Sequence, residues 1–401
     1  MDREKKGRYF LAFLRWVLLG LAVGGLGGLL GTGFHYALHF VTDIRLENPW
    51  LVWLLPAGGL ASVGLYRILK LRDNRGTNEV IEASLSGRPV SPLVAPGIIG
   101  ASCLTHLFGG SAGREGAALQ LGGSMASGLG QLLKMKQADR KILVTCGMAA
   151  VFAALFGTPL TAWLFTLEFA SVGTIFSPAL LPCFLASWSA ALISKAFGVH
   201  AEGLLLDNAL RLTLGTTARV VLLAVLVSLL GILMCYTFHK AEHFAKKFIP
   251  NDWVRITLGG LAIALLTLAV GDMRYNGAGM DMALSAVKGN TAWFDFALKL
   301  LFTAITLSAG FRGGEIVPTF CIGATFGCVA GGLLGLDPGI AGALGLVGLF
   351  CCATNAPLAS IILSLEMFGS SNLYAFALVC AICFVLSGKS SLYTSQQEPF
   401  R

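Results

Sequence analysis

The sequence predicts an all-α polytopic membrane protein made of two related halves with broken and half-spanning helices. Of its 401 residues, 55% are hydrophobic and only 12% are charged, and the mean hydropathy is +0.75. A helix needs ~20 apolar residues to span a bilayer, yet several apolar stretches are shorter or are broken by glycine and proline. Helices that stop within a membrane must bury their freed backbone groups in protein or line a polar cavity. Broken helices in both halves therefore indicate a transport site.

An internal duplication supports the two-half arrangement. Residues recur at a constant offset of 198 positions, which is the separation of Arg114 and Arg312. The matched pairs are Asn78 and Asn276, Arg114 and Arg312, Gly116 and Gly314, Gly147 and Gly345, Phe152 and Phe350, Pro159 and Pro357, Leu160 and Leu358, Leu167 and Leu365, and Glu168 and Glu366. A single long offset indicates two equivalent halves rather than a solenoid, whose period is far shorter.

The duplication and the apolar pattern predict one membrane domain. Its expected parts are a cytoplasmic N-terminus at 1–8, a first membrane repeat at 9–197, a connecting segment at 198–216, a second membrane repeat at 217–388 and a C-terminal segment at 389–401. A polar run at 72–92 interrupts the first repeat.

The charged residues and the lack of a cleavable signal peptide predict the membrane location and the orientation of the protein. Lys and Arg flanking a membrane span are retained in the cytoplasm, so the basic start of the chain predicts a cytoplasmic N-terminus in a multi-pass protein of the plasma (inner) membrane. These basic residues are Arg3, Lys5, Lys6 and Arg8. The first apolar run is too long for a cleaved signal peptide. The net charge of +8 suits contact with the lipid bilayer and does not indicate nucleic-acid binding.

Metal and enzyme chemistry find little support in the sequence. The ten cysteines are scattered through apolar segments, and we interpret them as small buried hydrophobic residues. The pairs His35/His39 and His239/His243 have helical spacing but no accompanying carboxylate. We therefore expect no metal and no cofactor, and the absence of a nucleophile and base set predicts a protein that is not an enzyme.

The segment Gly113-Arg114-Glu115-Gly116 places a carboxylate within apolar chain. Glycines let backbone N–H groups converge, and the helix expected from Ala117 onward adds partial positive charge, so this loop can bind an anion. Glu115 can occupy that site when ionised and leave it when protonated, which couples anion access to a proton. The alternative is a first-turn acid that only stabilises the helix; the high cost of an ionisable group at membrane depth favours the gating role. Arg114 either positions the loop or touches the ion.

The second loop repeats this pattern before another apolar run. Pro318 suits the first turn of a helix, and the backbone N–H groups of Ile316 and Val317 are candidate anion donors. Glu315 aligns with Ala117 in the repeat rather than with Glu115, so it is an addition to one half. We expect it to carry a proton or coordinate the ion, with a structural cap as the alternative.

These motifs resemble the CLC family of chloride channels and anion/proton antiporters over nearly the whole chain. Gly113–Gly116 is similar to the gating-glutamate motif, and Gly314–Pro318 is similar to the GxFxP motif of the second half. Arg75–Asn78 lies where the family has a Gly-Ser-Gly-Ile-Pro loop, and Lys389–Tyr393 is similar to the segment whose tyrosine hydroxyl contacts the central anion. The resemblance implies a CLC-type inverted repeat, a homodimer with one pathway per subunit and, in this chain, no CBS domains.

Four departures from the chloride type point to one branch of the family. They are Thr77-Asn78 in place of Ser-Gly, Val80 and Ala117 in place of two prolines, Phe169 in place of the inner proton-path glutamate, and Glu315 within the GxFxP motif. Loss of the inner glutamate together with a gained Glu315 is similar to the fluoride-selective branch. Val317 departs from that branch, in which a Thr precedes the proline.

Fluoride is small and strongly hydrated, so its site must supply close hydrogen bonds that offset dehydration. The expected anion-binding residues are Thr77, Asn78, Gly113, Arg114, Gly116, Ile316, Val317 and Tyr393. Two of these have alternatives, because Asn78 can cap a helix and Tyr393 can anchor at a membrane interface.

The resemblance and the loops together predict a proton-coupled anion antiporter that exports fluoride in exchange for protons. Glu115 is the expected gate, protonated from outside, and Glu315 a second site for protons or fluoride. The alternatives are a chloride or nitrate/proton exchanger and a passive anion channel. For Glu168 and Glu366, which end equivalent helices, we expect matching structural hydrogen bonds.

Overall fold

A computed structural model describes residues 3–201, 203–206, 208–211 and 213–398, and the side chains of residues 3–6 and 8 lie outside this description. The predicted roles of Arg3, Lys5, Lys6 and Arg8 therefore also lie outside it. The described chain is helical, with two isolated β-bridges and no strand. The predicted all-α fold class is confirmed.

The first half contains eight α-helices and two short 3-10 helices. Their bounds are α1 Arg3–Glu47, η1 Pro49–Leu54, α2 Leu55–Ile68, α3 Thr77–Ser86, α4 Val94–Leu107, α5 Glu115–Leu132, α6 Gln137–Phe156, α7 Pro159–Glu168, η2 Ser177–Ala179 and α8 Leu180–Ala196. The predicted polar interruption at 72–92 thus contains a helix, α3. Gly76, with φ +65°, precedes this helix as its N-cap, because glycine adopts such a conformation without steric cost.

The second half contains eight more α-helices. Their bounds are α9 Leu214–Phe248, α10 Asp252–Val270, α11 Met280–Val287, α12 Asp295–Ala309, α13 Ile316–Leu333, α14 Pro338–Thr354, α15 Pro357–Phe368 and α16 Leu373–Ser387. Helix α9 begins three residues before 217, the start predicted for the second repeat. The domain boundaries remain predictions, although the two halves have closely similar orders of helices.

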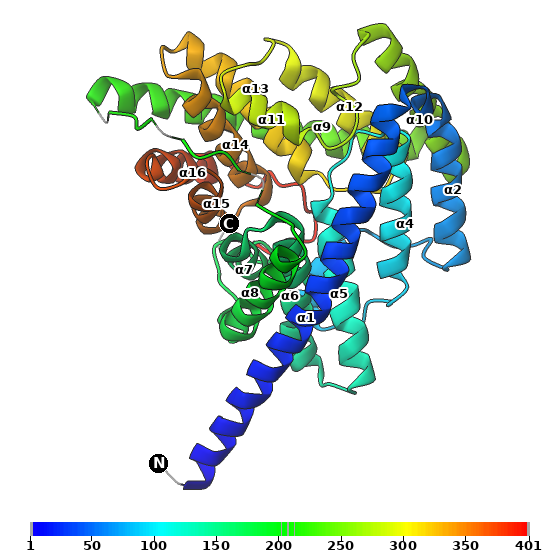
Figure 1. The fold of residues 1–401 in the computed structure, drawn as a ribbon, viewed down its shortest axis with the longest axis vertical. Coiled ribbons are helices and arrows are strands. Elements are labelled where there is room, and N and C mark those ends of the chain that lie inside the picture. Colours follow the sequence, from blue (N-terminus) through cyan, green and yellow to red (C-terminus); the bar gives the residue numbers. More distant parts are fainter. Residues whose placement is uncertain (1–2, 202, 207, 212, 399–401) are drawn as a thin grey trace.

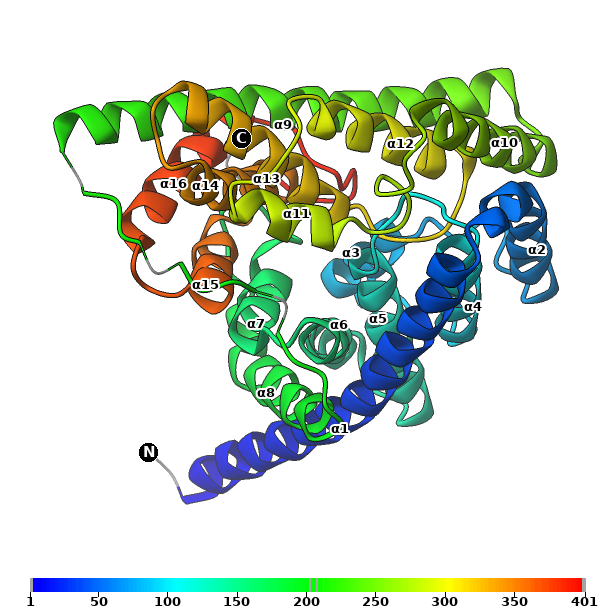
Figure 2. The same ribbon diagram turned by 45° about the horizontal axis from the view of Figure 1, so that its top comes forward.

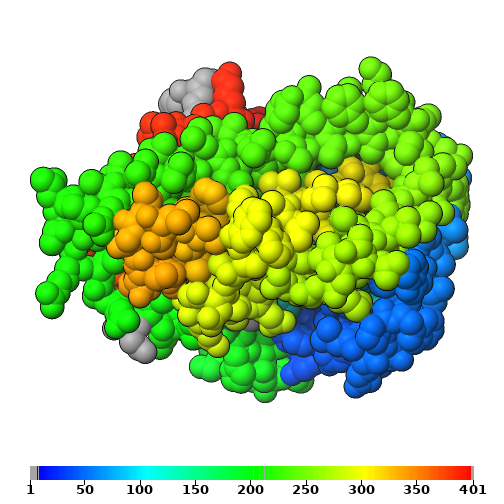
Figure 3. All heavy atoms as spheres, turned by 90° about the horizontal axis from the view of Figure 1, so that it is seen from above, coloured from blue at the N-terminus to red at the C-terminus, as the bar shows by residue number. Residues whose placement is uncertain are grey.

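The two halves form two groups of helices that meet at the centre. In Figures 1 and 2, α5 to α8 lie on one side and α13 to α16 on the other, with α9 crossing the second group. Seen from above, segments of the second half cover most of the face, and the early part of the chain lies at one edge (Figure 3). Six helical segments are long and apolar enough to cross a membrane, and the shorter helices stop within the bundle.

Glycines bring helices into close contact at equivalent helix crossings in both halves. A side chain on Gly122 or Gly147 would collide with the other's backbone where α5 crosses α6. Gly323 and Gly345 make the same arrangement between α13 and α14. Small residues allow helix backbones to approach in this way, which gives the van der Waals contact that drives packing in lipid. The glycine-rich composition thus has a packing role besides breaking helices.

Helices α7 and α15 exchange caps across the boundary between the halves. The carboxylate of Glu168, at the end of α7, accepts hydrogen bonds from the backbone N–H groups of Leu358 (3.1 Å) and Ala359 (2.8 Å) at the start of α15. Glu366, near the end of α15, accepts from the N–H groups of Leu160 (3.0 Å) and Thr161 (2.8 Å) at the start of α7. These bonds satisfy donors that a helix start leaves free. They agree with the structural role predicted for both glutamates.

Candidate functional site

Two loops from opposite halves pair at the centre of the bundle. The N–H of Gly113 donates to the carbonyl of Gly314 (2.6 Å), and the N–H of Gly314 donates back to the carbonyl of Gly113 (2.8 Å). The helices α5 and α13 begin directly after this pair. The start of α3 joins them, because the Thr77 hydroxyl contacts the Gly116 carbonyl at 3.5 Å. Three helix N-termini, each with a partial positive charge, therefore meet at one place.

Glu115 lies at this junction and is fully buried, with 0% exposure. Its Oε2 accepts a hydrogen bond from the backbone N–H of Arg114 (3.0 Å), whereas Oε1 has no partner among the described residues. The backbone amide of Val317, at the start of α13, also lies beside this carboxylate. Helix α5 begins at Glu115 itself, two residues before the predicted start at Ala117. The carboxylate thus folds back over backbone donors that an anion would use.

Glu315 lies on the other side of the paired loops. It is the N-cap residue of α13, and no side-chain cap hydrogen bond forms. Its Oε2 is buried without a partner among the described residues. A methyl group built on Gly116 would lie 3.3 Å from this oxygen and 3.3 Å from the Cα of Gly314. Glu315 therefore faces the opposite loop rather than capping its own helix.

Tyr393 points its hydroxyl into the protein interior. The residue is 3% exposed, and its hydroxyl oxygen is buried with no partner among the described residues. Its ring packs edge-on against Phe169 at 5.7 Å between centroids, and the preceding Leu392 N–H donates to the Ala353 carbonyl (2.8 Å). This burial excludes the alternative of an anchor at the membrane interface.

A polar cavity of about 530 Å³ leads from solvent to these groups. Thr77, Asn78, Glu315 and Tyr393 line it, whereas Glu115 is not among the lining residues. Both signs of charge are present around it. The charged lining residues are Arg67, Arg72, Asp73, Arg75, Glu242, Lys246, Asp252, Arg255, Arg312 and Glu315. The cavity thus reaches Glu315 and Tyr393 and ends short of Glu115.

Asn78 holds the C-terminal segment against the cavity. Its side-chain oxygen accepts a hydrogen bond from the Ser395 N–H at 3.0 Å. Gly76 is the N-cap of α3, so Asn78 does not cap that helix. The amide nitrogen of Asn78 is the donor that this arrangement leaves for an anion.

Arg114 directs its side chain toward helices outside the loop pair. Its guanidinium lies over the Phe156 ring at 5.1 Å and is 3.5 Å from Nδ1 of His35. The residue is 8% exposed. These contacts hold the Glu115 loop against α6 and α1, which favours the positioning role of Arg114 over contact with the ion.

Phe169 directly follows Glu168 at the end of α7, where the sequence resemblance leads us to expect a glutamate. It is fully buried, stacked on Phe165 at 4.6 Å between ring centroids. Its backbone carbonyl accepts a hydrogen bond from the Gln396 side chain (2.5 Å), which also donates to the Thr354 carbonyl (2.7 Å). An aromatic ring cannot take up a proton, so Phe169 offers no titratable group at this place.

Gln120 is a site residue that the sequence analysis did not identify. It lines the cavity, and its amide donates to the Gly116 carbonyl at 3.1 Å. Its side-chain oxygen is buried without a partner among the described residues. The available signal was a polar side chain one helical turn after Gly116 in an otherwise apolar helix.

Metal ligation finds no support in the described part of the chain, where no group of three or more His, Cys, Asp or Glu lies close enough to hold an ion. The ten cysteines are all free thiols, nine of them buried.

The fold and the paired loops define a membrane protein of the CLC type. The family described as voltage gated chloride channel matches residues 58–388, and this chain belongs to it. A "Chloride/fluoride channel protein" of Pseudomonas syringae pv. tomato is 33% identical over 391 residues, covering 96% of this chain and 86% of that protein. The "H(+)/Cl(-) exchange transporter ClcA" of Vibrio cholerae is 25% identical, with coverage of 89% and 82%.

Solved structures show the same fold. The crystal structure of a CLC-type fluoride/proton antiporter superposes with a TM-score of 0.93 at 32% identity, covering 97% of this chain and 99% of that one. A slow cyanobacterial Cl−/H+ antiporter superposes with a TM-score of 0.80 at 23% identity, covering 93% of this chain and 94% of that one. The CLC-type inverted repeat predicted from the motifs is confirmed.

Proposed function

We propose that this protein is a proton-coupled anion antiporter that exports fluoride in exchange for protons. The observation that carries the proposal is the pair of buried glutamates, Glu115 and Glu315, on either side of the joined loops. Each has a carboxylate oxygen without a partner among the described residues. A buried carboxylate with an unused oxygen can take up and release a proton as the local charge changes.

In the proposed cycle, Glu115 is the gate. Its ionised carboxylate occupies the backbone donors at the start of α5, which blocks the anion. Protonation removes the charge that holds it there, so the side chain leaves and an anion takes its place. Because carboxylate and anion compete for the same donors, one binding event excludes the other. This competition links the movement of anions to that of protons.

Glu315 is the proposed second site, at the inner end of the cavity. Phe169 supplies no titratable group at the position where the chloride type has its inner glutamate, and Glu315 lines the cavity directly. A proton that leaves Glu115 can therefore reach solvent through Glu315. The Tyr393 hydroxyl and the Asn78 amide are the proposed side-chain donors to the anion between them.

Fluoride is the proposed substrate because of the residues that distinguish this chain. Its high hydration energy demands short, strong hydrogen bonds, and hydroxyl, amide and backbone N–H donors gather at the junction. The Pseudomonas relative and the superposed antiporter, whose names include fluoride, support this choice. The Vibrio relative is named for chloride exchange, which makes chloride/proton exchange the second candidate.

The test is flux from proteoliposomes that hold the purified protein, with external anion and pH recorded together. Fluoride efflux with opposed proton movement and little chloride flux is the expected result. Chloride flux coupled to protons would assign the protein to chloride exchange. Anion flux that a pH gradient cannot drive would identify a channel.

The proposal also covers the oligomeric state, the membrane and the orientation of the protein. We expect a homodimer in the inner membrane, with the N-terminus and the cavity on the cytoplasmic side, and transport rather than enzymatic activity. The positive-inside distribution of Lys and Arg supports the orientation.

A further inference from the structure

Arg45, near the end of α1, is a buried cation without a counterion among the described residues. It is 6% exposed, and its Nε and Nη1 are buried with no hydrogen-bond partner among the described residues. Its side chain lies against two turns of the backbone. A methyl group built on Gly277 would be 2.9 Å from Nη1 and 3.0 Å from Nη2, and one built on Gly109 would be 3.6 Å from Cδ. The guanidinium therefore lies in a narrow space walled by glycine backbone.

A second buried cation lies on the other side of Gly277. Lys299 is 0% exposed, and its ammonium group donates to the carbonyls of Tyr275 (3.0 Å) and Gly277 (2.7 Å). The charges of Lys299 and Arg45 repel each other. No carboxylate of the described residues forms an ion pair with either group. Two uncompensated charges so close together in a buried place are unfavourable unless an anion joins them.

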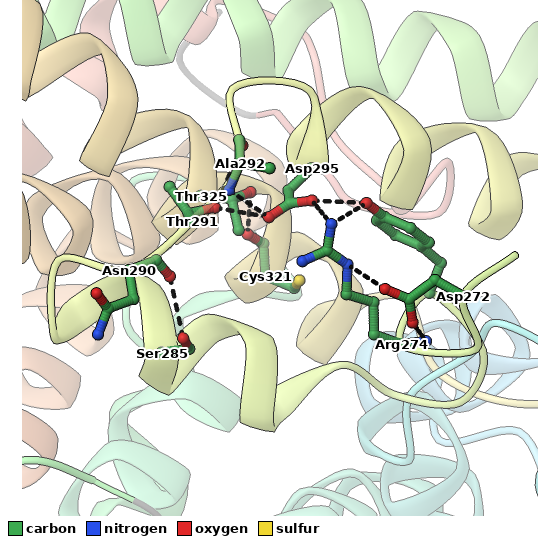
Figure 4. A network of polar contacts seen from close by, with 10 residues as sticks. Asp272, Arg274, Ser285, Asn290, Thr291, Ala292, Asp295, Cys321 and Thr325 are labelled. Carbon is green, nitrogen blue, oxygen red and sulfur yellow. Dashed lines mark hydrogen bonds and ion pairs between the residues drawn. The ribbon is translucent and has the colours of Figure 1, made fainter. Parts of the chain in front are cut away.

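The carboxylate most available to Lys299, that of Asp295 one turn earlier on α12, is already fully used. It accepts hydrogen bonds from the Tyr275 hydroxyl (2.6 Å), the Thr291 hydroxyl (2.9 Å) and the Ala292 N–H (2.8 Å). It also pairs with Arg274 at 2.8 Å. Figure 4 shows Arg274 held between Asp272 and Asp295. The two carboxylates and one guanidinium of this network carry a net charge of −1, but among the described residues neither carboxylate forms an ion pair with Arg45 or Lys299.

The buried cations lie at the end of the helix bundle opposite the cavity. Helices α2, α10 and α12 each have one end at the cavity, through Tyr66, Arg255 and Ala309. Their other ends lead to η1, to the loop that holds Gly277, and to Asp295. That loop is bonded to the Glu115 loop, because the Gly277 N–H donates to the Gly110 carbonyl at 3.1 Å. Arg45 thus lies beside the start of the Glu115 loop, on the side of that loop away from the cavity.

We propose that Arg45 and the backbone around Gly109 and Gly277 form a second anion-binding site, for a small monovalent inorganic anion such as fluoride or bromide. The two free guanidinium N–H groups supply charge-assisted hydrogen bonds, and Lys299 adds a favourable potential. This site receives an anion from the side opposite the cavity. The proposal depends neither on proton coupling nor on a preference for fluoride.

The test is a bromide anomalous-difference map of crystals of the full chain, combined with calorimetric titration of the purified protein with sodium fluoride. We expect a bromide peak at the Arg45 guanidinium in the unaltered protein. Arg45→Gln should remove the peak and lower the fluoride affinity of one class of site by about 10-fold or more. The matched control is Lys195→Gln, which removes an exposed positive charge at the end of α8 and should leave both results unchanged.

A second variant and three possible results decide whether Arg45 binds an anion. Arg45→Lys keeps the charge but loses the forked donor, so it should retain the site with weaker binding; it serves if Arg45→Gln does not fold. No peak at Arg45 together with fluoride binding that Arg45→Gln leaves unchanged would overturn the proposal. So would a lipid phosphate at the guanidinium, or a bromide peak without any loss of binding in Arg45→Gln, which would mark an adventitious ion only. Neither measurement requires transport, so loss of coupled flux would bear on the proposed function alone.

Discussion

At the residue scale, the properties of Glu115 follow from where its carboxylate lies. The group is fully buried at the start of α5, yet its Oε1 has no hydrogen-bond partner among the described residues, whereas Oε2 accepts from the N–H of Arg114. A carboxylate fully committed to structure would use both oxygens, as Glu168 and Glu366 do. All three glutamates lie at helix ends, but only Glu115 keeps a carboxylate oxygen without a described partner, whereas Glu168 and Glu366 have structural roles.

Replacing Glu115 with Gln should abolish proton coupling. Glutamine resembles the protonated acid in shape but cannot exchange a proton, so we expect proton movement to fall by about 100-fold or more. The measurement is simultaneous anion and pH recording from proteoliposomes. Glu47→Gln, at the exposed end of α1, is the control and should behave as the unaltered protein does. Intact coupled exchange in Glu115→Gln would refute the gating role.

A change at the Tyr393 hydroxyl is simpler to interpret, because the hydroxyl has no partner among the described residues to lose. Tyr393→Phe should leave thermal stability nearly unchanged and weaken fluoride binding by about 10-fold or more, the usual effect of losing a hydrogen bond to a charged group. Differential scanning fluorimetry and calorimetric titration check the two halves of this prediction. A large fall in melting temperature with unaltered affinity would show that the hydroxyl is structural.

At the element scale, the exchanged caps of α7 and α15 join the two halves of the protein. Each glutamate neutralises the N-terminus of the other's helix, so the two helices stabilise one another at both ends. Because the N–H groups of Leu358 and Ala359 are in the interior, they would have no water to replace Glu168.

Glu168→Gln should therefore lower the free energy of unfolding by about 1–3 kcal/mol, the cost of an unmade buried hydrogen bond. Glutamine keeps the shape of the side chain, but its NH2 group would face a backbone N–H that needs an acceptor, so one of the two hydrogen bonds is lost. Thermal unfolding in detergent is the measurement, and Glu242→Gln is the control, since its exposed ion pair with Lys246 contributes about 0–1 kcal/mol. Equal stability of the two variants would argue against the capping role.

The paired loops also depend on the absence of side chains. A methyl group on Gly314 would lie 2.7 Å from the backbone nitrogens of Glu115 and Gly116, which cannot move without displacing the start of α5. Gly314→Ala should thus abolish flux and lower stability. Gly25→Ala, where nothing lies within 4 Å of the added group, should preserve both. Normal flux in Gly314→Ala would mean that the loops are not held as described.

At the scale of the whole molecule, the C-terminal segment closes the site. Ser395 binds Asn78, and Gln396 binds carbonyls in both halves. These contacts fix Tyr393 in front of the cavity. Residues from the start, middle and end of the chain thus form one small site.

The proposed homodimer gives a prediction at this scale. Light scattering of the detergent-solubilised protein, corrected for bound detergent, should give a polypeptide mass of twice the chain mass of 42.2 kDa. One pathway per subunit predicts that a dimer with a single Glu115→Gln subunit retains about half of the coupled flux. A monomer that transports at the normal rate would contradict the dimer but leave the proposed exchange intact.

The membrane class, the duplication and the two loops follow from the amino-acid sequence alone, because each is a local signal. Long apolar segments indicate helices that lie in a lipid bilayer. Glu115 and Glu315 stand out because they are charged residues within such apolar segments. The sequence also supplied the departures at Phe169 and Glu315. The first residue of a helix is not fixed by such a local signal, because a glutamate just before a helix and a glutamate in its first turn give the same sequence pattern. Helix α5 accordingly begins at Glu115 rather than at the predicted Ala117.

Which groups come into contact is seen only in the folded chain. The partner of Asn78 is Ser395, more than 300 residues away, and the role of Gln120 depends on a cavity that several helices form together. The same is true of Arg45, whose lack of a counterion appears only when α1, α12 and the Gly277 loop are assembled. Long-range contacts of this kind depend on how helices pack in three dimensions, and no local pattern of residues encodes them.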